Sequence, residues 1–259
     1  MLVNISDDLI RLQSMGLLDS LLLDRTTKRN IMWATDAYAE RGPAYGQNEE
    51  ILPSLITGEN AGLIKTRARK AFEQQNARTR KRGEVFTPVW IVKRMCDDSD
   101  IAWFRRKGGF WKTDESGHIR FTKSRNWKQY VENRRMELTC GEAPYLTTRY
   151  DTGSGELIPV SERTGLLDRK LRAVNENAEG PEEWMEWTYR ALRSVYGYEF
   201  QGDSLLIARV NLLMAFSENM ESVWGRKPMP DQYKKIPSCT VLLDNPCIYA
   251  VCRVSIERN

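Results

Sequence analysis

The fold of this chain is decided by residues 137–146, which read ELTCGEAPYL. An acidic residue precedes a turn at Gly141, and a helix is expected to follow. Glycine lets a backbone approach a ligand closely, and a helix that begins there presents free N–H groups. This order of strand, glycine turn and helix predicts an α/β nucleotide site. The Gly-x-Gly-x-x-Gly spacing of dinucleotide sites is missing, so NAD is not the expected ligand.

A second strand and helix are predicted in residues 195–213, which read VYGYEFQGDSLLIARVNLL. A short strand ends at Glu199, and leucines at helical spacing follow it. A carboxylate after the second strand of such a fold can accept two hydrogen bonds from a ribose diol. Asp203 is the weaker candidate, because it falls where the helix would begin and suits a cap. The two segments predict a doubly wound (Rossmann-like) α/β core with a mostly parallel sheet.

Two more segments flank this core. Residues 83–92 read GEVFTPVWIV, in which Pro88 pushes Thr87 toward an extended conformation and suits the first turn of a helix. Near the C-terminal end, the apolar residues 239–243 predict a strand, and DNPCIY follows at residues 244–249. Taken alone, the first is only a helix start and the second only an Asn-Pro turn.

In this order the segments resemble the motifs of S-adenosylmethionine-dependent DNA adenine-N6 methyltransferases, the modification subunits of bacterial restriction–modification systems. The resemblance is best over residues 83–216. It implies methyl transfer to the amino group of a flipped adenine in double-stranded DNA. The chain departs from the family pattern in both motifs. In the first, Leu138 stands where Pro is usual and Glu142-Ala143 stands where a second small turn residue or Gly is common. In the catalytic motif, Cys247 replaces the second Pro and Ile248 displaces the aromatic residue to Tyr249.

The resemblance also implies which residues carry the site. S-adenosyl-L-methionine is expected to contact Phe86, Thr87, Pro88, Glu137, Thr139, Cys140, Gly141, Glu142, Tyr145 and Glu199. Within that set, Glu199 is assigned to the ribose hydroxyls. The catalytic residues are expected to be Asn245, Pro246 and Tyr249. Asn245 and the Pro246 carbonyl would accept hydrogen bonds from the adenine amino group, and Tyr249 would stack on the base.

Two alternatives stay open beside this interpretation. The first is a non-catalytic subunit that binds the cofactor or DNA and needs a partner chain, since the catalytic motif is imperfect and the later strands of a complete core are missing. A specificity or restriction subunit would be such a partner. The second is a restriction nuclease, which is disfavoured because no Asp…Glu-x-Lys arrangement of metal-binding carboxylates stands out.

Two basic stretches each allow two interpretations. Lys65 to Arg82 holds many cations against Glu73 alone, and could be a solvated helix face or an arm that contacts DNA phosphates. The insert between the first and second motifs contains Arg163, Arg169, Lys170 and Arg172. Those cations could meet phosphates, or could form surface ion pairs with Glu156, Glu162 and Asp168.

Composition sets wider bounds. The 259 residues are 41% hydrophobic, carry a net charge of +4 and include five cysteines in no zinc or disulfide spacing. Residues 1–23 are amphipathic, unlike a signal peptide, and no apolar run is long enough to cross a bilayer. We therefore expect a cytoplasmic protein without a metal or a membrane partner. Residues 1–82 are predicted as an N-terminal helical region, and residues 83–259 as the methyltransferase-like domain.

Overall fold

The computed structural model describes residues 1–24, 27–70, 79–80, 87–106, 112–113, 119–120 and 126–239. Within these ranges the chain is a mixed α/β protein. Strands β3 (Arg135–Leu138) and β4 (Val195–Tyr198) pair in parallel, with Glu137 opposite Gly197 and Leu138 opposite Tyr198. The short strands β1 (Lys112–Thr113) and β2 (Ile119–Arg120) pair antiparallel.

The sequence expectation of a parallel α/β unit is confirmed, but the doubly wound core is not. In the described ranges the parallel sheet has only two strands. The strand predicted at residues 239–243 is not found there: Cys239 ends helix α10 (Pro230–Cys239), and residues 240–243 lie outside those ranges. A glycine turn and a short apolar run are local features, and they do not determine how many strands pair in the sheet.

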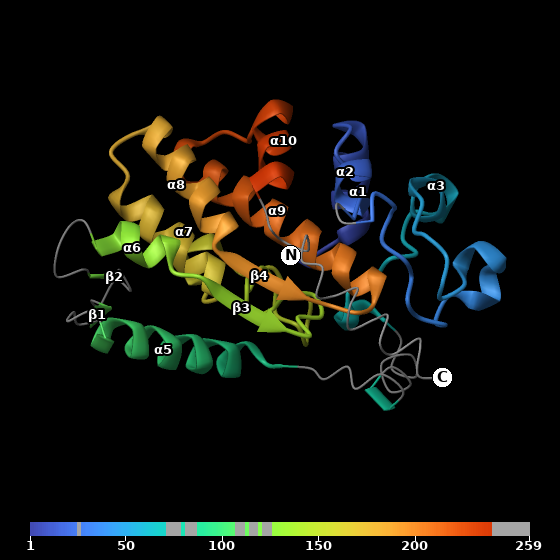
Figure 1. Ribbon diagram of the computed structural model, residues 1–259, viewed down its shortest axis with the longest axis horizontal. Coiled ribbons are helices and arrows are strands. Elements are labelled where there is room, and N and C mark those ends of the chain that lie inside the picture. Colours follow the sequence, from blue (N-terminus) through green and yellow to red (C-terminus); the bar gives the residue numbers. More distant parts are fainter. Residues whose placement is uncertain are drawn as a thin grey trace.

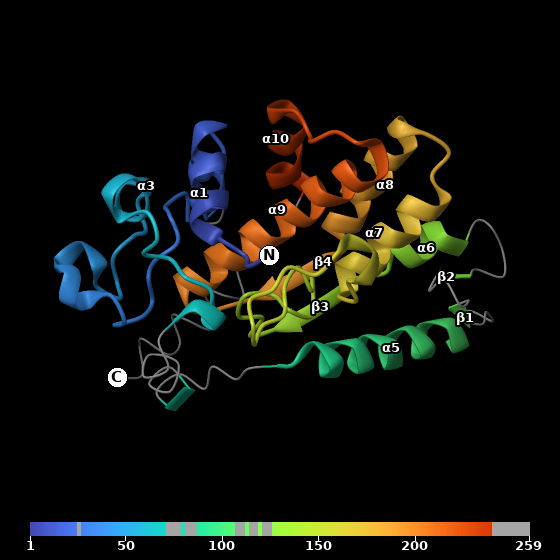
Figure 2. The ribbon, with the colours of Figure 1, turned by 180° about the vertical axis from the view of Figure 1, so that it is seen from behind.

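Helices cover both sides of the strand pair (Figures 1 and 2). Helix α5 (Val89–Arg106) runs along one side. On the other side lie α7 (Leu166–Asn177), α8 (Pro181–Arg193) and α9 (Gly202–Trp224), and α6 (Asn126–Glu132) packs against α7 and α8. The chain leaves β3, forms α7 and α8, and returns as β4, which is the crossover connection that parallel strands require.

Helix α9 is the centre of the hydrophobic core. Its residues from Gly202 to Ser217 are all buried, as expected of a helix with apolar residues on every side. Polar members of the helix are satisfied by distant segments: the Arg209 guanidinium donates to the carbonyls of Leu21 and Leu23, at the end of α2 (Leu18–Leu22). Cations suit the carbonyl end of a helix, so Arg209 fixes α2 on α9.

The N-terminal region joins the same core. Helices α1 (Ile5–Ser14) and α2 pack on α9, as the amphipathic pattern of residues 1–23 predicts. From Asp24 to Lys70, however, the described chain is mostly turns, isolated bridges and one-turn helices, of which α3 (Pro53–Ile56) is one. The helical expectation was wrong there, because glycine and proline punctuate the segment, as at Gly42-Pro43.

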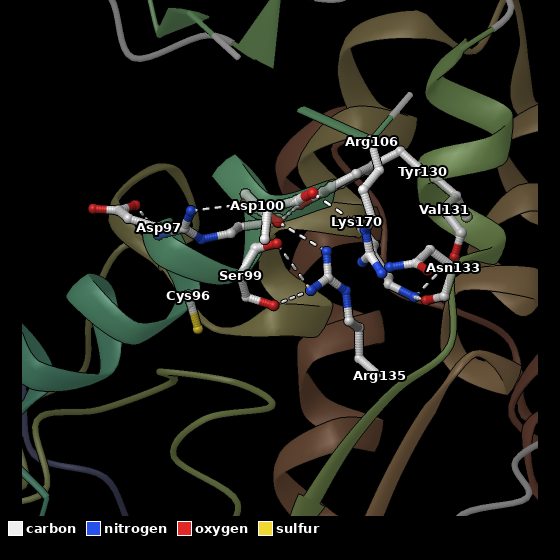
Figure 3. Close-up of polar contacts among 12 residues, drawn as sticks. Cys96, Asp97, Ser99, Asp100, Arg106, Tyr130, Val131, Asn133, Arg135 and Lys170 are labelled. Atoms are coloured by element: carbon white, nitrogen blue, oxygen red, sulfur yellow. Dashed lines mark hydrogen bonds and ion pairs between the residues drawn. The ribbon is translucent and has the colours of Figure 1, made fainter. Parts of the chain in front are cut away.

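A buried network of charges fixes α5 against β3 and α7 (Figure 3). Asp100 of α5 is 1% exposed and accepts from Arg169 at 2.8 Å, from Arg135 at 3.2 Å and from the Tyr130 hydroxyl at 3.0 Å. Arg169 also reaches Asp97 at 2.6 Å. Each cation thus meets a carboxylate, as buried charges require.

Both expectations for the basic insert were therefore wrong at three positions, Arg163, Arg169 and Lys170. Arg169 and Lys170 are 5% and 1% exposed, so neither faces DNA nor forms a surface pair. The Lys170 ammonium donates to the Val131 carbonyl at 3.0 Å, as well as to Asn133 and Ser194. Arg163 is also buried, and it pairs with Glu218 at 2.7 Å. In the part of the chain described, no helix combines the length and apolar character that a membrane span needs.

Candidate functional site

The loops after β3 and β4 meet at one edge of the sheet, because parallel strands place both of their carboxyl ends there (Figure 1). The Cys140 N–H donates to the Tyr198 carbonyl at 2.7 Å, which continues the ladder by one residue. Next, the Gly141 N–H donates to Glu199 Oε2 at 2.8 Å, and the Gln201 N–H donates to Glu199 Oε1 at 2.9 Å. Glu199 is 9% exposed. Its carboxylate therefore joins the two loops directly.

The loop after β3 has an unusual backbone. Thr139, Gly141 and Ala143 all have positive φ, at 53°, 55° and 65°. For the two residues that are not glycine, this left-handed conformation costs about 1–2 kcal/mol each. Such strain persists only where surrounding structure enforces it, and it gathers at functional sites. Among the described atoms, none lies within 4 Å of the position that a Cβ on Gly141 would take, so the loop opens to space there.

Gly197 of β4 makes room for this loop. A Cβ at Gly197 would lie 3.0 Å from the Cys140 sulfur and 3.1 Å from Leu146 Cδ1. The absence of a side chain lets the loop pack directly on the neighbouring strand. Burial raises the pKa of the Cys140 thiol well above its usual value and that of Cys96 to about 12. Both thiols therefore stay protonated and pack as small apolar groups.

The start of α5 lies beside the same loop. The helix begins at Val89, directly after Pro88, and the Thr87 carbonyl accepts from the Thr152 hydroxyl at 3.0 Å. Nearly two turns further along α5, the Tyr145 hydroxyl lies 3.0 Å from the sulfur of Met95. Thr87 thus contacts Thr152, and α5 contacts the end of the loop through Met95 and Tyr145. Phe86 lies outside the described residues.

Glu142 has structural partners within the protein. Its Oε1 accepts from the Arg67 N–H at 2.5 Å, and its Oε2 accepts from the Tyr150 hydroxyl at 2.6 Å. The Asn211 amide of α9 donates to the Glu142 carbonyl at 3.0 Å and to Tyr150 at 3.1 Å. Tyr150 and Asn211 were not among the predicted site residues. Asn211 lies within the stretch 195–213 that predicted the second strand and helix, and it holds the loop through the Glu142 carbonyl and Tyr150.

Glu137 contributes a buried oxygen that lacks a partner. It faces the loop from β3, and in the described part of the chain its Oε2 makes no hydrogen bond. Burial raises the pKa of Glu137 well above its usual value of 4.5, and the nearby Glu199 raises it further, while backbone hydrogen bonds from Tyr145 and Leu146 oppose the shift. This second carboxylate oxygen calls for a donor that the described residues do not supply.

The raised pKa of Glu137 gives a test of this arrangement. Its folded-state pKa lies above the unfolded value, so the contribution to stability is full below about pH 4.5 and is lost as pH rises through the folded-state pKa. We expect Glu137→Gln to raise the melting temperature at pH 8 by roughly 2–4 °C, the shift that about 1 kcal/mol gives in a chain of this size. Thermal melts of both proteins from pH 8 to pH 5 should show the difference shrinking as the pH falls. A lower melting temperature for the variant at pH 8 would contradict this assignment.

The remaining predicted residues are not placed. Asn245, Pro246 and Tyr249 lie outside the described residues. In the ranges that are described, no group of three or more His, Cys, Asp or Glu side chains gathers as a metal site would need. Comparison with protein-family models, with curated proteins and with solved structures found no match.

Proposed function

We propose that this chain binds S-adenosyl-L-methionine at the carboxyl edge of β3 and β4. The observation that carries the proposal is the parallel register of these strands, which brings Gly141 and Glu199 into hydrogen-bond contact at 2.8 Å. A strained glycine loop beside a carboxylate from the next strand is the arrangement that doubly wound folds use for adenosine ligands.

The residues present suit this cofactor. The open space at Gly141 would admit the ligand next to bare backbone. Glu199, fixed by two backbone N–H groups, would accept hydrogen bonds from the ribose hydroxyls. The orphaned Oε2 of Glu137 would accept from the ammonium group of the methionine moiety, which would also hold Glu137 ionised. When bound, the cofactor supplies a methyl group on a positively charged sulfur.

We further propose that the acceptor is adenine N6 in double-stranded DNA, within a restriction–modification system. Asn245, Pro246 and Tyr249 are the residues we propose to hold the flipped base. The protein's contribution would be orientation: the carboxyl edge holds the cofactor and the C-terminal motif holds the amino group, so that the two reacting atoms lie in line.

Isothermal titration calorimetry with S-adenosylmethionine tests the cofactor proposal. We expect micromolar binding that Glu199→Ala weakens at least tenfold, which is about 1.4 kcal/mol. Glu199→Gln keeps one acceptor oxygen and should bind with intermediate affinity. Glu162→Ala removes an exposed carboxylate that is not among the proposed cofactor contacts and should leave the affinity unchanged. A folded wild-type chain that does not bind would overturn the proposal.

A methyl-transfer assay on duplex DNA then distinguishes a catalytic chain from a non-catalytic subunit. Transfer that is lost in Asn245→Ala supports catalysis by this chain. Cofactor binding without transfer supports the alternative, a non-catalytic subunit that acts with a specificity or restriction partner.

A further inference from the structure

A pocket of about 570 Å³ lies apart from the cofactor loops, between the N-terminus of α1 and residues 61–69. Helix α1 contributes its first turn, and the facing segment contributes Lys65, Thr66 and Arg69. Lys65 and Arg69 are exposed, and neither has an ion-pair partner in the described part of the chain. For the stretch Lys65 to Arg82, the sequence allowed two interpretations, a solvated helix face or an arm that contacts phosphates.

The polar groups around this pocket favour an anion. The side chain of the N-cap residue, Asn4, makes no capping hydrogen bond, so the first N–H groups of α1 keep their donor capacity. Thr66 also lines the pocket, is 1% exposed, and its Oγ1 has no hydrogen-bond partner among the described residues. Two free cations, a free helix N-terminus and an unsatisfied hydroxyl are the donors that a phosphate group takes. Asp7 is the one acidic side chain in the pocket lining.

The segment that carries these cations is fixed to the candidate cofactor site. The Arg67 N–H donates to Glu142 in the loop after β3. Three residues later, the Lys70 ammonium forms a buried ion pair with Asp203, at 3.2 Å, in the first turn of α9. Lys65 and Arg69 are therefore displayed from a backbone that is braced at two points, and a phosphate bound there would lie on a rigid extension of the cofactor edge.

We infer that this pocket binds a backbone phosphate of double-stranded DNA through Lys65, Arg69 and the α1 N-terminus. The inference rests on the proposed function, because it is the adenine substrate that makes DNA the favoured source of the phosphate. Such a contact sets the position of the duplex relative to the cofactor and carries no sequence preference.

Binding of a fluorescent duplex of about two helical turns, followed by anisotropy, tests the inference. We expect the Lys65→Ala, Arg69→Ala double variant to bind more weakly between about 50 and 200 mM salt, and to lower the slope of log K against log salt by about one, because one phosphate contact is lost. Asp7→Asn should instead strengthen binding. The matched control is Arg226→Ala with Lys234→Ala, which removes the same charge from two exposed residues. Arg226 follows the C-terminal end of α9 and Lys234 lies on α10, so this variant should leave the slope near the wild-type value.

Titration with S-adenosylmethionine in the same variants separates this inference from the proposed function. Unchanged cofactor affinity in both double variants, with the slope lowered only in the pocket variant, supports the phosphate contact. Equal slopes in the two double variants overturn it, as does a wild-type chain that binds cofactor but no duplex. Preference for a matched RNA duplex over DNA would also overturn the choice of partner.

Discussion

Replacing Gly202 with alanine is expected to lower the free energy of unfolding by about 3 kcal/mol or more. The new Cβ would lie 1.9 Å from the Met32 carbonyl oxygen and 3.0 Å from Ile51 Cδ1. Because the Gly202 N–H also donates to the Trp33 carbonyl at 2.9 Å, neither backbone can withdraw without losing this bond. The start of α9 and the N-terminal region would have to separate. Urea denaturation followed by tryptophan fluorescence measures the change.

Helix propensity predicts the opposite sign, which makes the test sharp. In an unobstructed helix, Gly→Ala stabilises by up to about 1 kcal/mol. Gly225→Ala is the control: Gly225 ends α9 with φ of 63°, and no described atom lies within 4 Å of its Cβ position. It should cost only the left-handed penalty of about 1 kcal/mol. Similar losses of unfolding free energy in the two variants would contradict the claim that close packing requires glycine at position 202.

Asp100→Asn is expected to cost about 3–5 kcal/mol, because it leaves Arg169 and Arg135 in the interior without their shared carboxylate. The shape of the side chain is kept, so the loss reports charge and not a cavity. The same denaturation experiment measures it. Since Asp100 lies on α5, which contacts Tyr145 of the candidate site through Met95, we also expect weaker cofactor binding.

Asp97→Asn is the matched control for this network. Asp97 binds the same Arg169 but its side chain is 22% exposed, against 1% for Asp100. Burial opposes ionisation of Asp97, yet hydrogen bonds from Lys93 and Arg169 lower its pKa below the usual value. Water can replace part of the lost interaction at an exposed pair, so about 1 kcal/mol or less is expected. Equal losses at Asp97 and Asp100 would contradict the role given to burial.

The sequence predicted those parts of the fold that depend on neighbours along the chain. The strand ending before Glu199, the helix that follows it and the helix after Pro88 are all found, because period, glycine and proline act locally. The partners of buried charges were not predictable in this way. Arg169 meets Asp100 from 69 residues away, and Glu142 meets Arg67 from 75 residues away. Residue type alone made both look like ligand contacts.

For the candidate site, the order of motifs predicted which segments meet but not how each side chain is used. Gly141 and Glu199 come together as expected, whereas the Glu142 carboxylate is taken up by Arg67 and Tyr150. Gly197 has no side chain and was not predicted as a site residue. It nevertheless lets the loop pack on β4. A close approach between two segments depends on their three-dimensional placement, which a single sequence does not encode in any local pattern.

Hydrogen–deuterium exchange of the wild-type chain, with and without saturating S-adenosylmethionine, tests the central claim most directly. Binding at the carboxyl edge of β3 and β4 predicts slower exchange in peptides covering residues 137–146 and 196–202, with α10 unchanged. Unaltered exchange in both loops, or slowing confined to another part of the chain, would contradict the location of the site.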